Sequence, residues 1–212
     1  MLIIALNAAA FVYEMSLPAK ELQVLIDAWA LTPARFLDGP WNRVTWLPVL
    51  TSMFLHGGWI HLGGNMLYLW IFGNNIEDRL GTLRFVGFYL ATGIIATLGQ
   101  VAYAPASTVP LVGASGAISG VLGAYLVLYP RARVLTLIPV FFILELIAVP
   151  AVFVIGVWFL MQLAQGVGSI SQQATAAGVA WWAHIGGFLA GAVLILPAAY
   201  ADRKTPRFKT WR

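Results

Sequence analysis

The stretch Gly113-Ala114-Ser115-Gly116-Ala117-Ile118-Ser119-Gly120 places a glycine-flanked serine at the start of an apolar segment that ends near Pro130. A lone serine in such a segment is usually only a small residue that lets membrane helices pack. Two other apolar segments change this interpretation, because one carries His61 with Asn65 and the other carries His184. The chain has three histidines, so two of the three lie inside hydrophobic runs.

Composition indicates an integral membrane protein. Of the 212 residues, 60% are hydrophobic and 9% are charged, whereas soluble domains carry about 25% charged residues. The absence of cysteine excludes disulfides and thiolate nucleophiles. The pI near 9.6 is explained by basic residues that set membrane topology. We therefore expect the lipid bilayer, and no nucleic acid, as a partner.

Six apolar segments predict an all-α fold, a polytopic bundle of six transmembrane helices in a single domain over residues 1–212. The expected helices cover residues 1–15, 57–76, 83–103, 113–129, 138–162 and 181–199. The first segment lacks the basic start of a signal peptide, so we interpret it as a spanning helix. Pro139 and Pro150 are expected to bend the fifth helix, and residues 165–180 to form a polar, uncharged loop.

The connection over residues 16–50 is expected to form an interfacial first loop. Its residues 20–29 alternate apolar and charged side chains at helical spacing, which is typical of helices that lie in the membrane surface. Nine of the twelve lysines and arginines fall in the turns after the second and fourth segments and in a basic tail over residues 201–212. The positive-inside rule then places both termini in the cytoplasm.

The polar residues of the second, fourth and sixth segments are predicted to meet. All three segments run inward from the outer face, and a rise of about 1.5 Å per residue puts Ser115, His184, His61 and Asn65 in the outer third of the bilayer. GxxxG patterns in register with these residues predict that the fourth and sixth helices pack closely, with Ser115 facing His184. The glycines are Gly116, Gly120, Gly187 and Gly191.

These residue types predict a serine hydrolase with a Ser–His dyad. A serine hydroxyl is a weak nucleophile until a base, usually neutral histidine, removes its proton, so Ser115 is the candidate nucleophile and His184 the candidate base. His61, Asn65 and the backbone N–H of Ser115 are candidate oxyanion donors. Hydrolysis also needs a hydrated cavity open to the outside, but no metal or cofactor. Three acidic residues are too close to the inner face to complete a triad: Glu77, Asp78 and Glu145.

The motifs that carry these residues are similar to those of the rhomboid intramembrane serine proteases, in the same order and across the six-helix core. They are HGGWIHLGGN over residues 56–65, GASG over residues 113–116 and AHIGGFLAG over residues 183–191. The resemblance implies an endopeptidase of the bacterial inner membrane that cleaves transmembrane protein substrates near the outer face of the bilayer.

The resemblance also implies roles around the site. It assigns the same dyad and oxyanion donors, structural positions at Gly113, Gly116 and Gly187, and a histidine, His56, that braces the first loop. Glu77 matches an acidic position that is structural. The resemblance further implies that part of loop 16–50 lies in the bilayer, and that the fifth segment with residues 165–180 acts as a lateral gate and cap.

Two positions depart from the family pattern. Leu47-Pro48 stands near the place of a Trp-Arg pair in the first loop of some members. Ser119 stands four residues after the nucleophile, where some members carry an aromatic residue that stacks on the catalytic histidine. A hydrogen bond from Ser119 is one alternative for holding the His184 ring.

Other interpretations fit the sequence less well. A catalytically inactive relative that binds transmembrane clients would be expected to lose the serine or the histidine, and both are present. A transporter predicts repeats, broken helices and polar residues near the midplane. A metalloprotease predicts a His-Glu-x-x-His motif, which the sequence lacks. For His61 with Asn65, and for His184, the alternative to catalysis is a buried polar residue that joins helices.

Overall fold

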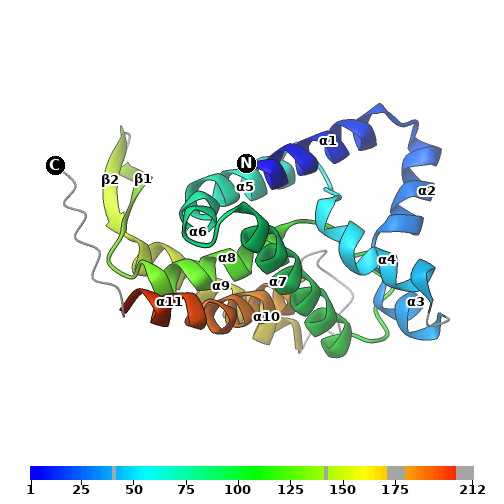
Figure 1. Ribbon diagram of the computed structural model, residues 1–212. Helices are drawn as coiled ribbons and strands as arrows, with labels where there is room; N and C mark the ends of the chain where they lie inside the picture. Colours follow the sequence, from blue (N-terminus) through cyan, green and yellow to red (C-terminus); the bar gives the residue numbers. More distant parts are fainter. Residues whose placement is uncertain (40–41, 141–142, 171–179, 204–212) are drawn as a thin grey trace.

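The computed structural model describes residues 1–39, 42–140, 143–170 and 180–203, and most of its helices lie side by side in a bundle (Figure 1). In chain order, the elements are α1 (Leu2–Ser16), α2 (Ala19–Trp29), α3 (Pro33–Asp38), α4 (Arg43–Thr51), η1 (Ser52–Phe54), α5 (Trp59–Tyr68), η2 (Leu69–Gly73), α6 (Asn74–Leu80), α7 (Thr82–Tyr103), α8 (Ser115–Leu128), β1 (Arg133–Val140), β2 (Ile143–Pro150), α9 (Ala151–Ile170), α10 (Trp181–Leu194) and α11 (Leu196–Arg203).

Helix α8 lies at the centre of the bundle, packed against α7 and α10. Every residue from Ala117 to Tyr125 is buried. With 14 residues the helix is about 21 Å long, shorter than the roughly 30 Å hydrocarbon core of a bilayer. The chain therefore reaches Ser115 through non-helical backbone, which is tolerated at depth where it lines a cavity. Residues 110–113 of this connection line the cavity described below.

Three of the described helices are long and apolar enough to cross a membrane: Thr82–Tyr103, Ala151–Ser169 and Trp181–Tyr200. The apolar helices Leu2–Ser16 and Ser115–Leu128 are shorter. The second predicted segment runs from Trp59 to Leu80 as α5, the π-helical turn η2 and α6. The chain is thus a mostly helical integral membrane protein, while the full count of six spans stays a prediction.

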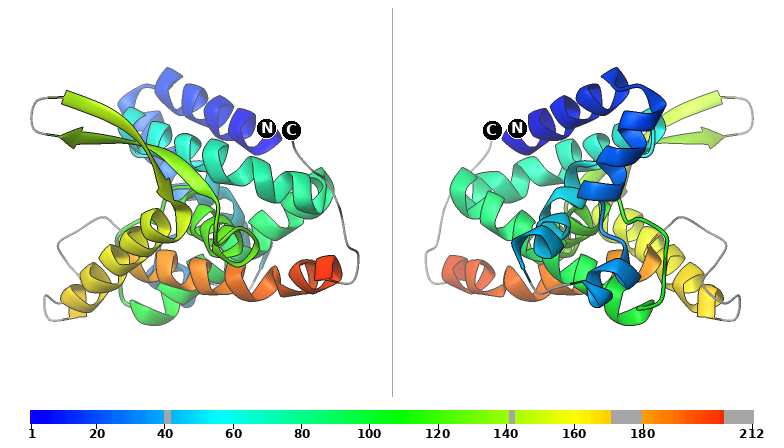
Figure 2. Two further views of the ribbon diagram at one scale, coloured as in Figure 1. Left: turned by 90° about the vertical axis from the view of Figure 1, so that its left-hand side faces the viewer. Right: turned by 90° about the vertical axis from the view of Figure 1, so that its right-hand side faces the viewer.

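The predicted fifth helix over residues 138–162 is wrong in its first half, so the fold is not purely all-α. β1 and β2 pair antiparallel, with Leu137 opposite Leu146, and this hairpin projects from the bundle (Figure 2). The residue before a proline is pushed toward extended backbone, and proline interrupts a helix ladder. Pro139 and Pro150 therefore favour the strands over residues 133–140 and 143–150, and α9 begins only at Ala151. An apolar run alone does not separate buried helix from strand.

One of the two polar connections contains the helix expected in it, and the other is partly helical where a loop was expected. Helix α2 covers the interfacial helix predicted within loop 16–50, and the Thr51 hydroxyl donates to the Trp29 carbonyl at 2.7 Å. Residues 165–170, predicted as loop, continue α9. Residues 171–179 of that loop, and residues 204–212 of the basic tail, lie outside the described residues.

Candidate active site

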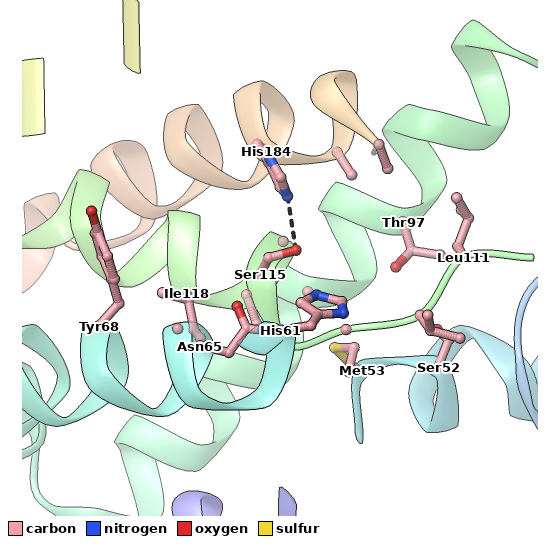
Figure 3. Close-up of a pocket in the computed structure, with 18 of the residues that line it drawn as sticks. Ser52, Met53, His61, Asn65, Tyr68, Thr97, Leu111, Ser115, Ile118 and His184 are labelled. Atoms are coloured by element: carbon pink, nitrogen blue, oxygen red, sulfur yellow. Dashed lines mark hydrogen bonds between the residues drawn. The ribbon is translucent and has the colours of Figure 1, made fainter. Parts of the chain in front are cut away.

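Ser115 and His184 lie in contact between two neighbouring helices. Ser115 is the first residue of α8 and His184 the fourth residue of α10. The His184 Nε2 atom lies 2.8 Å from the Ser115 Oγ atom, as the dashed line in Figure 3 marks. His184 is 8% exposed. This is the geometry in which an imidazole can take the proton of a serine hydroxyl.

Glycines allow this approach because the backbones of α8 and α10 touch. A Cβ atom added at Gly187 would collide with the carbonyl oxygen of Gly116, and one at Gly191 would collide with that of Gly120. A Cβ atom at Gly123 would likewise meet the carbonyl oxygen of Phe188. The close packing predicted from the GxxxG patterns is present, and at this helix separation Ser115 and His184 lie within hydrogen-bonding distance.

His61 presents a ring nitrogen to the same space from α5 (Figure 3). The backbone N–H of Gly57 donates to His61 Nδ1 at 3.3 Å, so in the neutral ring the proton resides on Nε2. A Cβ atom at Gly113, whose φ is +122°, would lie 2.8 Å from both Cε1 and Nε2 of this ring. Only glycine, with positive φ and no Cβ, lets the backbone approach the ring so closely.

Asn65 contributes a second side-chain donor one turn along α5. The residue is 8% exposed, and among the described residues its buried Nδ2 atom has no hydrogen-bond partner. The same Cβ position at Gly113 lies 3.6 Å from Nδ2. Burying an unpaired amide donor is costly, so this nitrogen is available for an acceptor that enters the cavity.

The backbone N–H of Ser115 is a third donor, because the first N–H groups of a helix have no partner within it. It lies beside a cavity of about 410 Å³. The cavity is lined by all four predicted catalytic and oxyanion residues and by residues from α7, α9 and the two connections that precede α8 and α10. Among the lining residues are Ser52, Met53, Thr97, Leu111, Ile118, Trp158 and Ala180.

Ser119 does not hold the His184 ring. Its hydroxyl donates to the Ser115 carbonyl oxygen at 2.6 Å, within α8. The ring of His184 is instead held from α9 and from its own helix. Gln162 Oε1 lies 2.7 Å from His184 Nδ1, and the Trp158 and Trp181 rings lie 6.0 and 6.2 Å from the imidazole, centroid to centroid.

Gln162 and Trp158 are functional candidates that sequence reasoning missed. Their i, i+4 spacing puts them on one face of α9, and Gln162 is a polar residue in an apolar run. A polar residue within an apolar run is the sequence signal that could have identified Gln162. It does not indicate that the face carrying Gln162 and Trp158 contacts His184. The aromatic contact that Ser119 cannot supply from α8 comes from Trp158 on α9.

His56 lies behind His61 and contacts α1. Its backbone N–H donates to the Glu14 carboxylate at 3.2 and 3.3 Å, and its ring packs edge-on against Phe11. The resemblance implied a brace of loop 16–50, whereas these contacts join His56 to α1. Burial lowers the pKa of His56 to about 4, so the ring next to His61 is neutral. Glu14, a buried carboxylate on α1, was not singled out from the sequence.

Comparison with known proteins agrees with the motifs. Residues 43–200 match the family model of the rhomboid domain. Rhomboid protease GluP of Bacillus subtilis (strain 168) is 35% identical over 116 residues, which cover 55% of this chain and 21% of that protein. Putative rhomboid protease YdcA of the same organism is 35% identical over 124 residues, 58% of this chain and 59% of the relative.

A mitochondrial relative is similar over a shorter stretch. Rhomboid protein 1, mitochondrial, of Saccharomyces cerevisiae (strain ATCC 204508 / S288c) is 37% identical over 93 residues, which cover 42% of this chain and 27% of that protein. The chain thus matches less than two thirds of the length of each of these relatives.

Proposed function

We propose that this chain, which belongs to the rhomboid family, is an intramembrane serine endopeptidase that cleaves transmembrane protein substrates through Ser115 and His184. The observation that carries the proposal is the 2.8 Å contact between Ser115 Oγ and His184 Nε2 at the edge of the cavity. The candidate nucleophile, base and oxyanion donors line one cavity, which is the arrangement that acyl transfer requires.

The first half of the reaction uses all of these groups. Ser115 Oγ attacks the scissile carbonyl carbon while its proton passes to His184 Nε2. The carbonyl oxygen becomes an oxyanion and accepts hydrogen bonds from the Ser115 N–H, His61 Nε2–H and Asn65 Nδ2. A preorganised donor of this kind contributes about 3 to 4 kcal/mol of transition-state stabilisation.

The second half releases both products. His184 gives its proton to the leaving amine, the peptide bond breaks, and the N-terminal part of the substrate remains as an ester on Ser115. Water then attacks this ester while His184 takes a proton from it and returns one to Ser115 Oγ. The cavity beside the dyad supports this step because hydrolysis inside a bilayer needs a water-filled space.

The substrate must expose backbone at the site. A helical peptide bond is shielded by its own hydrogen bonds, so the outer part of a substrate helix has to unwind before attack. Glycine and proline lower the cost of unwinding by about 1 and 3 kcal/mol relative to alanine. We therefore expect preferred substrates to carry these residues near the cleaved bond.

The orientation of the chain follows from its charges, as a further part of the proposal. Arg131 and Arg133 lie beyond the end of α8 opposite Ser115, and Arg79 donates to the Ala198 carbonyl at 2.6 Å in the same region. By the positive-inside rule this end is cytoplasmic. The dyad then faces the outer side of what we propose is a bacterial inner membrane.

Ser115→Ala and His184→Ala are expected to abolish cleavage of a transmembrane substrate in detergent or liposomes while leaving the protein folded, as circular dichroism checks. A fluorophosphonate should label Ser115 of the wild-type protein, as mapped by mass spectrometry, and should not label Ser115→Ala. Ser16→Ala, in the exposed last turn of α1, is the matched control and should cut and label normally. Full activity in either site variant would refute the dyad, and an unlabelled wild-type protein that still binds substrates would favour an inactive client-binding role.

A further inference from the structure

A glutamine from α9 contacts the nitrogen of His184 that faces away from Ser115. Gln162 Oε1 lies 2.7 Å from His184 Nδ1, and both residues are 8% exposed. We infer that Gln162 is a positioning residue that fixes the proton of His184 on Nδ1, so that Ser115, His184 and Gln162 act as one chain of hydrogen bonds. The inference rests on the proposed serine-protease function.

The hydrogen bonds require this proton arrangement. A neutral imidazole has one N–H and one lone pair. An amide oxygen can only accept, so the Nδ1 atom opposite Gln162 Oε1 carries the proton. Nε2 then keeps its lone pair and accepts the hydroxyl proton of Ser115 at 2.8 Å. In the other tautomer, Nε2 carries the proton and cannot act as a base.

The same oxygen also suits the charged ring that forms during the reaction. When His184 has taken the proton of Ser115, both ring nitrogens carry protons. Gln162 Oε1 still accepts from Nδ1–H, and a hydrogen bond from a charged donor is stronger than one from a neutral donor. The contact is therefore expected to strengthen in the transition state and to raise the rate more than substrate binding.

The rest of α9 holds the glutamine in place. Trp158, one turn earlier on the same face, lies against the imidazole. Further along α9, a Cβ atom at Gly166 would lie 3.2 Å from Ile185 Cδ1, so α9 packs closely against α10 there. This packing leaves Gln162 few accessible rotamers. The orientation of the His184 ring therefore depends on how α9 packs against α10.

The direct test is the tautomer of His184. Protein labelled with ¹⁵N-histidine carries three histidines, and spectra of His56→Asn, His61→Asn and His184→Asn assign their ring nitrogens. We expect His184 to show a protonated Nδ1 and a bare Nε2. In Gln162→Met, which keeps length but loses the acceptor, the population with Nε2 protonated should increase. In Gln162→Glu, which keeps an acceptor, Nδ1 should stay protonated.

Kinetics give the second readout. Gln162→Met is expected to lower kcat by about 10- to 100-fold, the range for losing one buried hydrogen bond, with KM within about twofold. Gln162→Glu should recover most of this loss. Gln100→Met is the matched control, because Gln100 Oε1 accepts from the Ala183 N–H on α10 at 3.2 Å and does not contact the ring in the hydrogen bonds of the described chain. It should leave the His184 tautomer unchanged.

Two results would overturn the inference: a wild-type His184 protonated on Nε2, or a Gln162→Met protein with unaltered tautomer and kcat. Failure of the proposed function can be told apart from failure of this inference. A wild-type protein with the expected tautomer that neither cleaves substrate nor reacts with the fluorophosphonate would lack the activity but keep the hydrogen bonds. Circular dichroism of each variant checks that it is folded.

Discussion

His61 and His184 present opposite chemistry to the cavity because different groups hold their Nδ1 atoms. The Gly57 N–H donates to His61 Nδ1, which leaves a proton on Nε2 and makes that ring a donor. The Gln162 oxygen faces His184 Nδ1, and in the tautomer that we infer from this contact Nε2 keeps its lone pair and the ring is an acceptor. One neutral side-chain type can therefore supply both an oxyanion donor and a base.

At this scale, the buried Nδ2 atom of Asn65, which has no partner in the described part of the chain, yields a prediction. Asn65→Ala is expected to lower kcat by about 10²- to 10³-fold, the cost of one oxyanion donor, with little change in KM, because the donor meets its acceptor only in the transition state. Steady-state cleavage measures both constants. The matched control is Asn75→Ala at an exposed position of α6, which should stay within about twofold of wild type. A rise in KM with unchanged kcat would argue against an oxyanion role.

At the scale of elements, the site depends on how closely α8 and α10 approach. Their contact is made by backbone atoms at Gly116 and Gly187, with no side chain between them. Helix association in membranes relies on such close packing. The serine and the histidine belong to different helices, so any increase in helix separation lengthens their hydrogen bond directly.

Two adjacent glycines of α10 test this dependence. Gly187→Ala places a methyl group against the Gly116 carbonyl, so we expect a loss of about 1 to 3 kcal/mol in stability, as for other overpacked sites, and a large loss of activity. Gly186→Ala meets only Ala96 Cα at 3.9 Å and should be neutral or slightly stabilising. The difference in stability and in activity between the two variants is measured by thermal unfolding and by substrate cleavage. Equal behaviour of the two variants would contradict the packing argument.

At the scale of the whole molecule, the candidate dyad lies at the start of α8 and α10, whereas Arg131 and Arg133 lie beyond the other end of α8. Helices α5, α8 and α10 all begin near the cavity, with Trp59, Ser115 and Trp181 as their first residues. Helices α2, α3 and α4 gather at one end of the bundle, and the β-hairpin projects at the other (Figure 1). By the positive-inside rule, this arrangement favours the outer side of the membrane for the proposed active site.

The absence of cysteine makes this orientation testable with single-cysteine variants. Gln23→Cys on α2 is expected to react with a membrane-impermeant maleimide in intact spheroplasts, since α2 lies at the proposed outer end. Asp78→Cys on α6 should react only after the membrane is opened. Both positions are exposed, so reactivity reports the side of the membrane. The reverse pattern would invert the proposed topology.

Much of the site could be predicted because it depends on residue types at fixed spacing along single helices. Helix periodicity places these residues relative to one another. It puts Ser115 at the start of an apolar helix, His61 and Asn65 on one face of another, and glycines on the face of a third that carries His184. Their shared depth follows from helix rise, and their chemistry from what a serine, an imidazole and an amide can do. These features are local, and tertiary packing left them intact.

What only the tertiary structure decided are the contacts between segments far apart in sequence. Gln162 and His184 meet across 22 residues, and Glu14 and His56 across 42, and periodicity along one helix does not say which neighbour its polar face meets. The pairing of β1 with β2 is a further contact of this kind, because prolines favour extended backbone but do not say which segment an extended strand will pair with. Sequence alone identified the groups that we propose do the chemistry, whereas packing determined which atoms hold them in place.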